Sequence, residues 1–124
     1  MRSPTPAESA PGPDPAADLR DHLPALRSAL IQQRRFRTEQ LAALRTAVPA
    51  APAQEEVVET LRHGARIALA GIEAALVRMD RGRYGSCVHC AAPIPLERLE
   101  ILPAVALCMT CQRAEDQTRT EDQA

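Results

Sequence analysis

The sequence has few of the residues that usually fill a globular core. It contains one Phe, one Tyr and no Trp among 124 residues, and aromatic side chains normally supply much of the buried area of a core. Alanine and leucine dominate instead, which suits helices that pack along a narrow seam. We therefore expect no thick core, and the length leaves room for one domain or for a small domain with an extension.

Lysine is absent as well: all fifteen basic residues are Arg, and the formal net charge is −1. This balance argues against a nucleic-acid binder that works through a broad basic field. The sequence also has no run of about 18 apolar residues, which would indicate a transmembrane helix, and its start lacks the apolar segment of a secretory signal. We therefore expect a cytoplasmic, reducing location, with no membrane span and no direct nucleic-acid binding.

The four cysteines form two Cys-x-x-Cys pairs. Cys87 and Cys90 are separated from Cys108 and Cys111 by seventeen residues, which matches the C-x₂-C-x₁₅₋₂₀-C-x₂-C pattern of a four-thiolate zinc site. Two disulfides would need an oxidising compartment, and a thioredoxin-like redox pair would need a βαβ pattern around it. We therefore predict that all four cysteines bind one Zn²⁺. Because no coordination position stays open, the ion should be structural.

No residue pattern indicates an enzyme. The sequence has neither a nucleophile with a base at a known spacing nor a Gly-rich phosphate loop, and the predicted metal site is closed. His89, inside the first cysteine pair, is a rival ligand that we expect to face solvent, because four thiolates already complete the site. The zinc is therefore expected to hold the fold together and not to do chemistry.

Leucines at helical spacing predict a first helix from Asp18, a residue type that suits an N-cap. Their spacings of three and four residues are those of a coiled-coil seam. Pro24 is favoured in a first helical turn, which moves the expected start to about Leu23. The helix should end near Val48. Its seam should be weakly packed in the middle, where the apolar face is interrupted by Gln33, Arg34, Arg35 and Arg37.

A second helix is predicted after a short connector with two prolines. It opens with Glu55, Glu56 and Glu59, acids that the helix dipole favours in the first turns, and it ends near Asp80 with Gly82 as a left-handed C-cap. Because the connector is short, the two helices should run antiparallel. The predicted seam of the second helix comprises Val58, Leu61, Ala65, Ala68, Ile72, Ala75 and Met79.

These elements predict a mainly α fold in three parts. Residues 1–17 are a Pro-rich arm expected to be disordered. Residues 18–80 form a long antiparallel two-helix coiled-coil hairpin with its tip at about 48–54, and residues 81–124 form a small four-cysteine zinc-finger module with a short C-terminal helix. A two-helix hairpin buries little area per residue, so its elongation indicates a role in reaching something. The expected core of the module comprises Ile94, Leu96, Leu99, Ile101, Leu102, Val105 and Leu107.

The sequence around the cysteines also carries a resemblance to a known family. The residues concerned are Met79-Asp80-Arg81-Gly82-Arg83-Tyr84-Gly85-Ser86-Cys87, Cys90, Ile94-Pro95, Arg98-Leu99, Pro103-Ala104, Cys108 and Cys111-Gln112. Over roughly residues 72–113 the chain resembles the DksA/TraR zinc-finger family. The resemblance implies a non-enzymatic transcription factor that binds RNA polymerase directly, without binding DNA. It also implies a hairpin whose tip enters the secondary channel of the polymerase, often together with the alarmone ppGpp.

Two positions depart from the family pattern. DksA members carry Asp-x-x-Asp-Ala at the hairpin tip, whereas this chain has no acid at 48–54. Glu55 and Glu56 stand close to the tip as candidate partner-binding residues, although the family's acidic role is not carried over to them. Ala91 replaces the family's glycine after the second cysteine, which is tolerable if Ala91 avoids positive φ.

The missing acids leave two functions to be distinguished. The first is a DksA/TraR-like regulator that binds RNA polymerase as a monomer, with the participation of ppGpp left open. The second is a zinc-capped coiled-coil adaptor that has lost the polymerase-channel activity. A stable homodimer that hides both seams would favour the adaptor, because such a dimer could not enter a channel.

Overall fold

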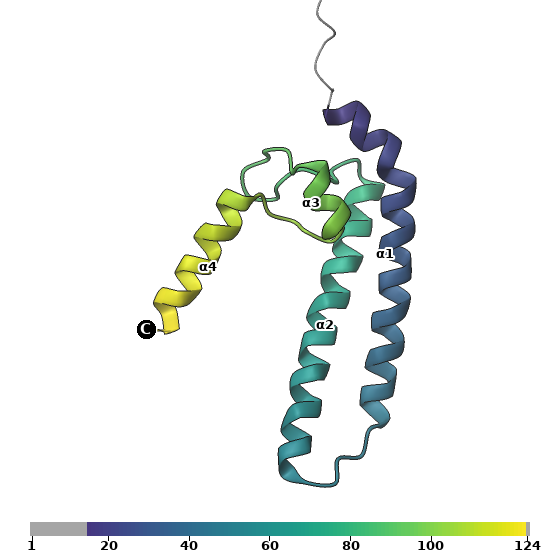
Figure 1. The fold of residues 1–124 in the computed structure, drawn as a ribbon, viewed down its shortest axis with the longest axis vertical. Coiled ribbons are helices and arrows are strands. Elements are labelled where there is room, and N and C mark those ends of the chain that lie inside the picture. The colour runs from purple at the N-terminus through teal and green to yellow at the C-terminus, as the bar shows by residue number, and fades with distance from the viewer. Residues whose placement is uncertain (1–14, 124) are drawn as a thin grey trace, which may run out of the picture.

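The computed structural model describes residues 15–123, in which α1 (Pro15–Thr46), α2 (Pro52–Asp80), α3 (Leu96–Ile101) and α4 (Met109–Gln123) follow one another. Figure 1 shows α1 and α2 side by side and antiparallel, α3 at the end away from their connecting turn, and α4 extending away from the hairpin. The predicted mainly α fold with a helical hairpin is confirmed. Among the described helices, none is long and apolar enough to cross a membrane.

The first helix begins earlier than the sequence predicts. α1 begins at Pro15 and carries Pro24 in its interior, so the predicted start near Leu23 is wrong. The predicted arm lies outside the described residues except for 15–17, which belong to α1. An interior proline removes one backbone hydrogen bond and bends a helix, and the first turns of α1 lean to the side of α3 in Figure 1. The turns of α1 before Pro24 remain helical because Leu19 and Leu23 pack against the core.

The seam between α1 and α2 is dense near α3 and thin toward the turn. No residue of α1 between Leu30 and Leu41 is buried, which agrees with the polar interruption read from the sequence. Leu61, predicted in the seam, is 48% exposed, so its assignment is wrong. The buried residues of the seam are Leu26, Leu30, Leu41, Ala65, Ile72, Ala75 and Leu76.

A polar contact replaces Leu61 at this level of the hairpin. The guanidinium of Arg62 crosses to α1 and donates from Nε and Nη2 to the carbonyl oxygen of Leu44, at 2.9 and 2.7 Å. The last carbonyls of a helix lack intrahelical partners, so Arg62 satisfies one of them from the opposite helix. Near the turn the two helices are therefore joined partly by charge-assisted hydrogen bonds and less by apolar packing.

The end of α2 follows the predicted C-cap. Gly82 has φ +70°, and its N–H donates to the Met79 carbonyl at 3.2 Å, while the Arg83 N–H donates to the Arg78 carbonyl at 2.8 Å. This pair of bonds is a Schellman motif, which needs a left-handed residue that glycine adopts without strain. The motif turns the chain sharply from α2 into the first cysteine pair.

One core joins the hairpin to the zinc-finger module. It comprises Leu26, Leu30, Ile72, Ala75, Leu76, Tyr84, Ile94 and Leu99. The assignment of Ile101 and Leu102 to the core of the module is wrong, since their side chains are 77% and 49% exposed. The six-residue α3 turns a single face to the core and buries only Leu99. Tyr84 is buried as well, and its hydroxyl donates to the carbonyl oxygen of Pro103 at 2.8 Å.

Candidate metal centre

The first cysteine pair lies in a tight turn held by backbone hydrogen bonds. Ser86 and Pro93 form an isolated antiparallel bridge, and the Cys87 N–H donates to the Ala92 carbonyl at 2.8 Å. The Ala91 N–H donates back to the Cys87 carbonyl at 2.9 Å. These bonds close the chain on itself, so both cysteine side chains of the pair project from one small loop.

Gly85 brings this loop close to α1. Its φ is +90°, and a Cβ at this position would lie 2.6 Å from Cδ2 of Leu19. Glycine is therefore required both by the backbone conformation and by the packing of α1. The contact explains how the first turns of α1, far from the cysteines in sequence, support the loop that carries Cys87.

The second cysteine pair lies at the start of α4. Cys108 precedes the helix and Cys111 lies in its first turn. The Gln112 N–H donates to the Cys108 carbonyl at 2.9 Å, and the Cys111 N–H donates to Cys108 Sγ at 3.5 Å. These two bonds fix Cys108 against the first turn of α4, so that both cysteines of the second pair lie on the same side of the helix start.

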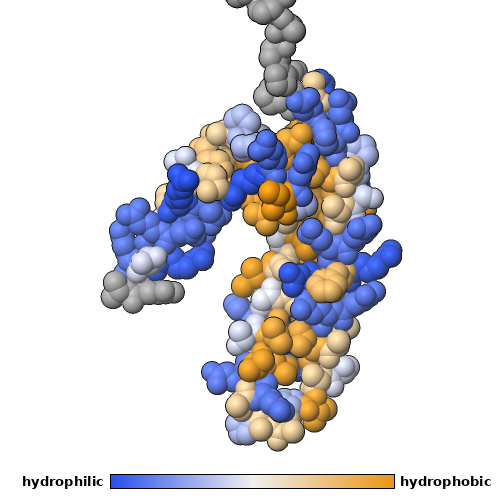
Figure 2. Space-filling model, in the orientation of Figure 1, coloured by the Kyte–Doolittle hydropathy of each residue, from blue (hydrophilic) through white to orange (hydrophobic). Residues whose placement is uncertain are grey.

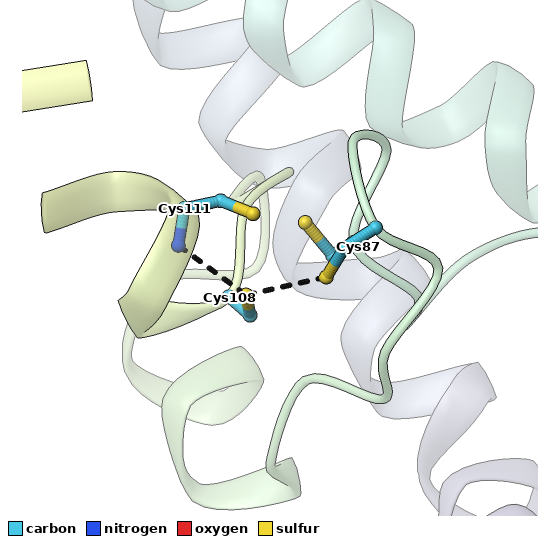
Figure 3. Close-up of side chains that lie close together, drawn as sticks. Cys87, Cys108 and Cys111 are labelled. Carbon is cyan, nitrogen blue, oxygen red and sulfur yellow. Dashed lines mark hydrogen bonds between the residues drawn. The ribbon is translucent and has the colours of Figure 1, made fainter. Parts of the chain in front are cut away.

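The fold brings the two pairs together. The four sulfurs of Cys87, Cys90, Cys108 and Cys111 all lie within 4.8 Å of one another, and the sulfurs of Cys90 and Cys108 are 3.6 Å apart. Figure 3 shows the side chains of Cys87, Cys108 and Cys111 turned toward one shared space. Tetrahedral zinc with bonds of about 2.3 Å separates its sulfurs by about 3.8 Å. The donor set and its spacing therefore fit one structural zinc ion.

The thiols have divergent acidities in this arrangement. The Cys87 pKa is lowered to about 6, chiefly because the backbone N–H of Cys108 stabilises its thiolate. The Cys111 pKa is raised to about 12, because the neighbouring thiols of Cys108, Cys87 and Cys90 form hydrogen bonds that favour its protonated form. Without a cation, a thiolate in the group makes ionisation of its neighbours harder. All four cysteines could be thiolates together if they held a zinc ion, because the cation would offset the repulsion between their charges.

Ala91 does not meet the condition under which it would replace glycine without strain. Its φ is +64°, and it is the non-glycine residue with positive φ in residues 15–123. A left-handed conformation costs an ordinary residue roughly 1 kcal/mol relative to glycine. The hydrogen bonds of the loop and the neighbouring metal site hold Ala91 in this conformation. The departure from the family pattern therefore has a local cost in stability.

The other predicted residues lie in different places. His89 is exposed, as the sequence suggested. Glu55 and Glu56 are exposed in the first turns of α2, at the opposite end of the hairpin from the cysteines (Figure 1). The sequence reading missed the apolar surface next to them, where Val48 is 91% and Val57 58% exposed. The sequence did carry a signal for this surface, because residues 46–54 include no charged residue.

The fold and the site define a C4 zinc-finger protein with an extended helical hairpin. Residues 82–117 match the prokaryotic dksA/traR C4-type zinc finger. The uncharacterized protein YbiI of Escherichia coli (strain K12) is 42% identical over 50 residues, which cover 36% of this chain and 57% of that protein. The chain thus spans little more than half the length of this relative.

The similarity in structure extends over most of the molecule. The structure of transcription factor DksA2 from Pseudomonas aeruginosa matches with a TM-score of 0.64 and 25% sequence identity, over 88% of this chain and 94% of that chain. The hairpin and the zinc finger therefore match together and in the same arrangement. Residues 82–117 thus match a zinc finger of the dksA/traR type, and the chain as a whole is similar in fold to DksA2.

Proposed function

We propose that this protein is a DksA/TraR-like transcription regulator of the cytoplasm. It binds RNA polymerase through the zinc-stabilised hairpin, at the secondary channel, without direct contact to DNA and without enzymatic activity. All four cysteines, Cys87, Cys90, Cys108 and Cys111, serve as zinc ligands. The observation that supports the proposal best is the match in fold to a solved transcription factor over 88% of the chain.

The shape of the molecule agrees with this proposal. A hairpin of two helices, of 32 and 29 residues, is about 45 Å long at 1.5 Å per residue, and it is only two helices thick (Figure 1). Such a rod can enter a channel that excludes a compact domain of the same mass. The zinc-finger module at its base limits how far the hairpin can enter.

Crosslinking tests the partner and the orientation together. A photoreactive residue at Ala50, which is exposed in the turn, should crosslink to core RNA polymerase from the same organism at the secondary channel. The same label at Ala114 of α4 should crosslink elsewhere or not at all. If the zinc-loaded protein neither crosslinks nor co-purifies with polymerase, the proposal fails.

Substitution tests the part played by the acids nearest the tip. Changing Glu55 and Glu56 together to Ala removes charges that make no ion pair among residues 15–123, so the fold should be unaffected. A change in transcription in vitro would assign them a role in the bound complex. Unchanged transcription would place the activity in other residues.

The zinc-capped adaptor is the second candidate, and the apolar tip favours it. Val48 is exposed in the turn, where DksA members carry acids, and Val57 is exposed next to it in α2. This surface suits contact with another protein more than chemistry near an active site. Light scattering distinguishes the two functions. A monomer supports channel entry, whereas a stable homodimer that covers the seam supports the adaptor.

A further inference from the structure

A recess lies beside the first cysteine pair, and Cys87 forms part of its wall. It lies between the last turn of α2 and the loop that carries Cys87, with a volume of about 430 Å³. Its lining includes three arginines, Arg78, Arg81 and Arg83, and two exposed aliphatic side chains. Val77 and Val88 are 44% and 52% exposed. We call this the arginine recess.

The fold, and not chance proximity on a flexible loop, brings the three arginines together. The Schellman motif that ends α2 joins the backbone of Arg83 to that of Arg78, and the Arg81 N–H donates to the Val77 carbonyl at 3.0 Å. The three Cα atoms are therefore fixed relative to one another by hydrogen bonds. Such a pre-formed arrangement reduces the entropy lost when an anion binds.

The three arginines of the recess carry more positive charge than is required to neutralise the zinc site. Four thiolates on Zn²⁺ leave a net charge of −2, against three guanidinium groups. The nearest acid in sequence, Asp80, is paired with Arg27 of α1 at 2.8 Å. Within residues 15–123, Arg78, Arg81 and Arg83 form no ion pair. The recess thus keeps a positive charge for which the described part of the chain provides no counter-ion.

Arg78 is the most buried of the three arginines. It is partly buried, and its guanidinium makes one long hydrogen bond, from Nη2 to the Val105 carbonyl oxygen at 3.4 Å. Burial lowers its pKa, because desolvation disfavours the charged form. A guanidinium carries five N–H donors, and water reaches a partly buried guanidinium poorly. An anionic acceptor that enters the recess would therefore form charge-assisted hydrogen bonds with donors of Arg78 that lack a partner within residues 15–123.

We propose that the arginine recess binds an acidic segment of the protein partner, with a carboxylate on the arginines and an aliphatic side chain against Val77 and Val88. The aliphatic rim favours a peptide over a nucleic acid, and so does the net charge of −1 on the whole chain. This inference rests on the proposed function and adds a second contact at the base of the hairpin. It assigns to Arg81 and Arg83 a role beyond the charge balance of the zinc site.

The first test measures affinity for core RNA polymerase with the zinc-loaded full chain. R81E/R83E should weaken binding by at least about tenfold, because attractive pairs become repulsive, with zinc content unchanged. R34E/R35E is the charge-matched control, since both residues are exposed in α1 and form no ion pair with residues 15–123. R81K/R83K should retain most of the affinity. If R81E/R83E and R34E/R35E lose affinity equally, or if neither loses affinity, the proposal that the arginine recess binds the partner is overturned. No binding by the unmodified chain would instead count against the proposed function.

The second test does not depend on the polymerase. A capped peptide of alternating Glu and Val, titrated into the ¹⁵N-labelled zinc-loaded chain, should shift the amide signals of Arg83, Ser86 and Val88. A matched peptide of alternating Lys and Val should not, and R81E/R83E should abolish the shifts. Equal shifts from both peptides, or shifts confined to the hairpin tip, would overturn the proposal.

Discussion

The core cluster lies at the zinc-finger end of the hairpin, whereas the most exposed large apolar side chain of residues 15–123 lies at the turn end. Leu30 and Leu99 are 0% and 1% exposed at the zinc-finger end, against 91% for Val48 and 58% for Val57 at the turn. Figure 2 shows hydrophobic side chains gathered on the surface of the lower half of the hairpin, toward the turn. The first set stabilises the fold, and the second leaves an apolar surface free for contact.

The two ends also differ in how their polar groups are arranged. At the zinc-finger end, the Tyr84 hydroxyl bonds to a backbone carbonyl inside the core. At the turn end the polar contacts are made across the surface, as by Arg62. Substitutions should therefore be costly at the zinc-finger end and cheap at the turn end. Substitutions at the two ends, together with removal of the metal, can test this difference.

Loss of the metal should have the largest effect. Cys108→Ser, or removal of zinc with a chelator, should unfold residues 81–123, because structural zinc contributes on the order of 10 kcal/mol to small modules. Circular dichroism and metal analysis would measure the loss of helix and of zinc. His89→Ala is the control and should retain both. A Cys108→Ser protein with full helicity and one zinc ion would contradict the comparison.

A charge in the buried seam should cost less than the metal but separate the two helices. Ile72 is 3% exposed, and Ile72→Asp should destabilise the hairpin by about 3 to 5 kcal/mol, because a buried carboxylate would have no partner. Ile67, on the same helix, is 60% exposed. Urea denaturation should show that Ile67→Asp changes the free energy of unfolding by less than about 0.5 kcal/mol. Similar losses at both positions would contradict the assignment of Ile72, and not Ile67, to the buried seam.

High pH should weaken the zinc-finger end through Tyr84. Burial raises its pKa from 10.0 to about 12. Because the folded pKa lies above the unfolded value, this contribution to stability is complete below pH 10 and is lost as the pH rises toward 12. Tyr84→Phe should cost about 1 kcal/mol at neutral pH, from the lost hydrogen bond to Pro103. Denaturation measured from pH 9 to 12 should show a steeper decline in the unmodified chain than in Tyr84→Phe.

Relief of strain should stabilise the zinc loop. Ala91→Gly places glycine at φ +64° and should raise the free energy of unfolding by about 1 kcal/mol. Ala92, the next residue, is not at positive φ, so Ala92→Gly should lower it by a similar amount. Thermal denaturation of the zinc-loaded forms would compare the two. If the two substitutions change the free energy of unfolding in opposite directions, Ala91 is strained; changes in the same direction would contradict the strain.

The smallest effect is expected at the tip. Val48→Ser changes a side chain that is 91% exposed, so the free energy of unfolding should change by less than about 0.5 kcal/mol. If the apolar tip is a contact surface, affinity for the partner should fall although stability does not. A large loss of stability would show that the turn end is structural, like the zinc-finger end.

Much of the fold and of the site could be predicted from residue patterns. The two Cys-x-x-Cys pairs at their spacing indicated the metal and its closed coordination, and Gly82 indicated the end of α2. These features depend on neighbours close in sequence or on spacings that one metal ion imposes. The start of α1 was misplaced because Pro24 is a strong local signal, which the packing of Leu19 against the zinc-finger module overrides.

Other features depended on contacts between distant segments. Leu61 continued the seam in sequence, but Arg62 makes the contact with α1 instead. Ile101 and Leu102 looked like core residues, yet the short α3 turns only Leu99 inward. Hydrophobicity alone does not say which side of a short helix meets the core.

Residue patterns were enough to predict the mainly α composition, the metal site and the length of the hairpin, because helical periodicity and ligand spacing are local properties. Packing between distant segments joins the hairpin base and the zinc finger in one core, and it places three arginines around a recess beside Cys87. The strain at Ala91 likewise became visible only in the folded chain. These outcomes depend on the turn after α2 and on α1 packing over the loop at Gly85, which bring together residues far apart in the chain.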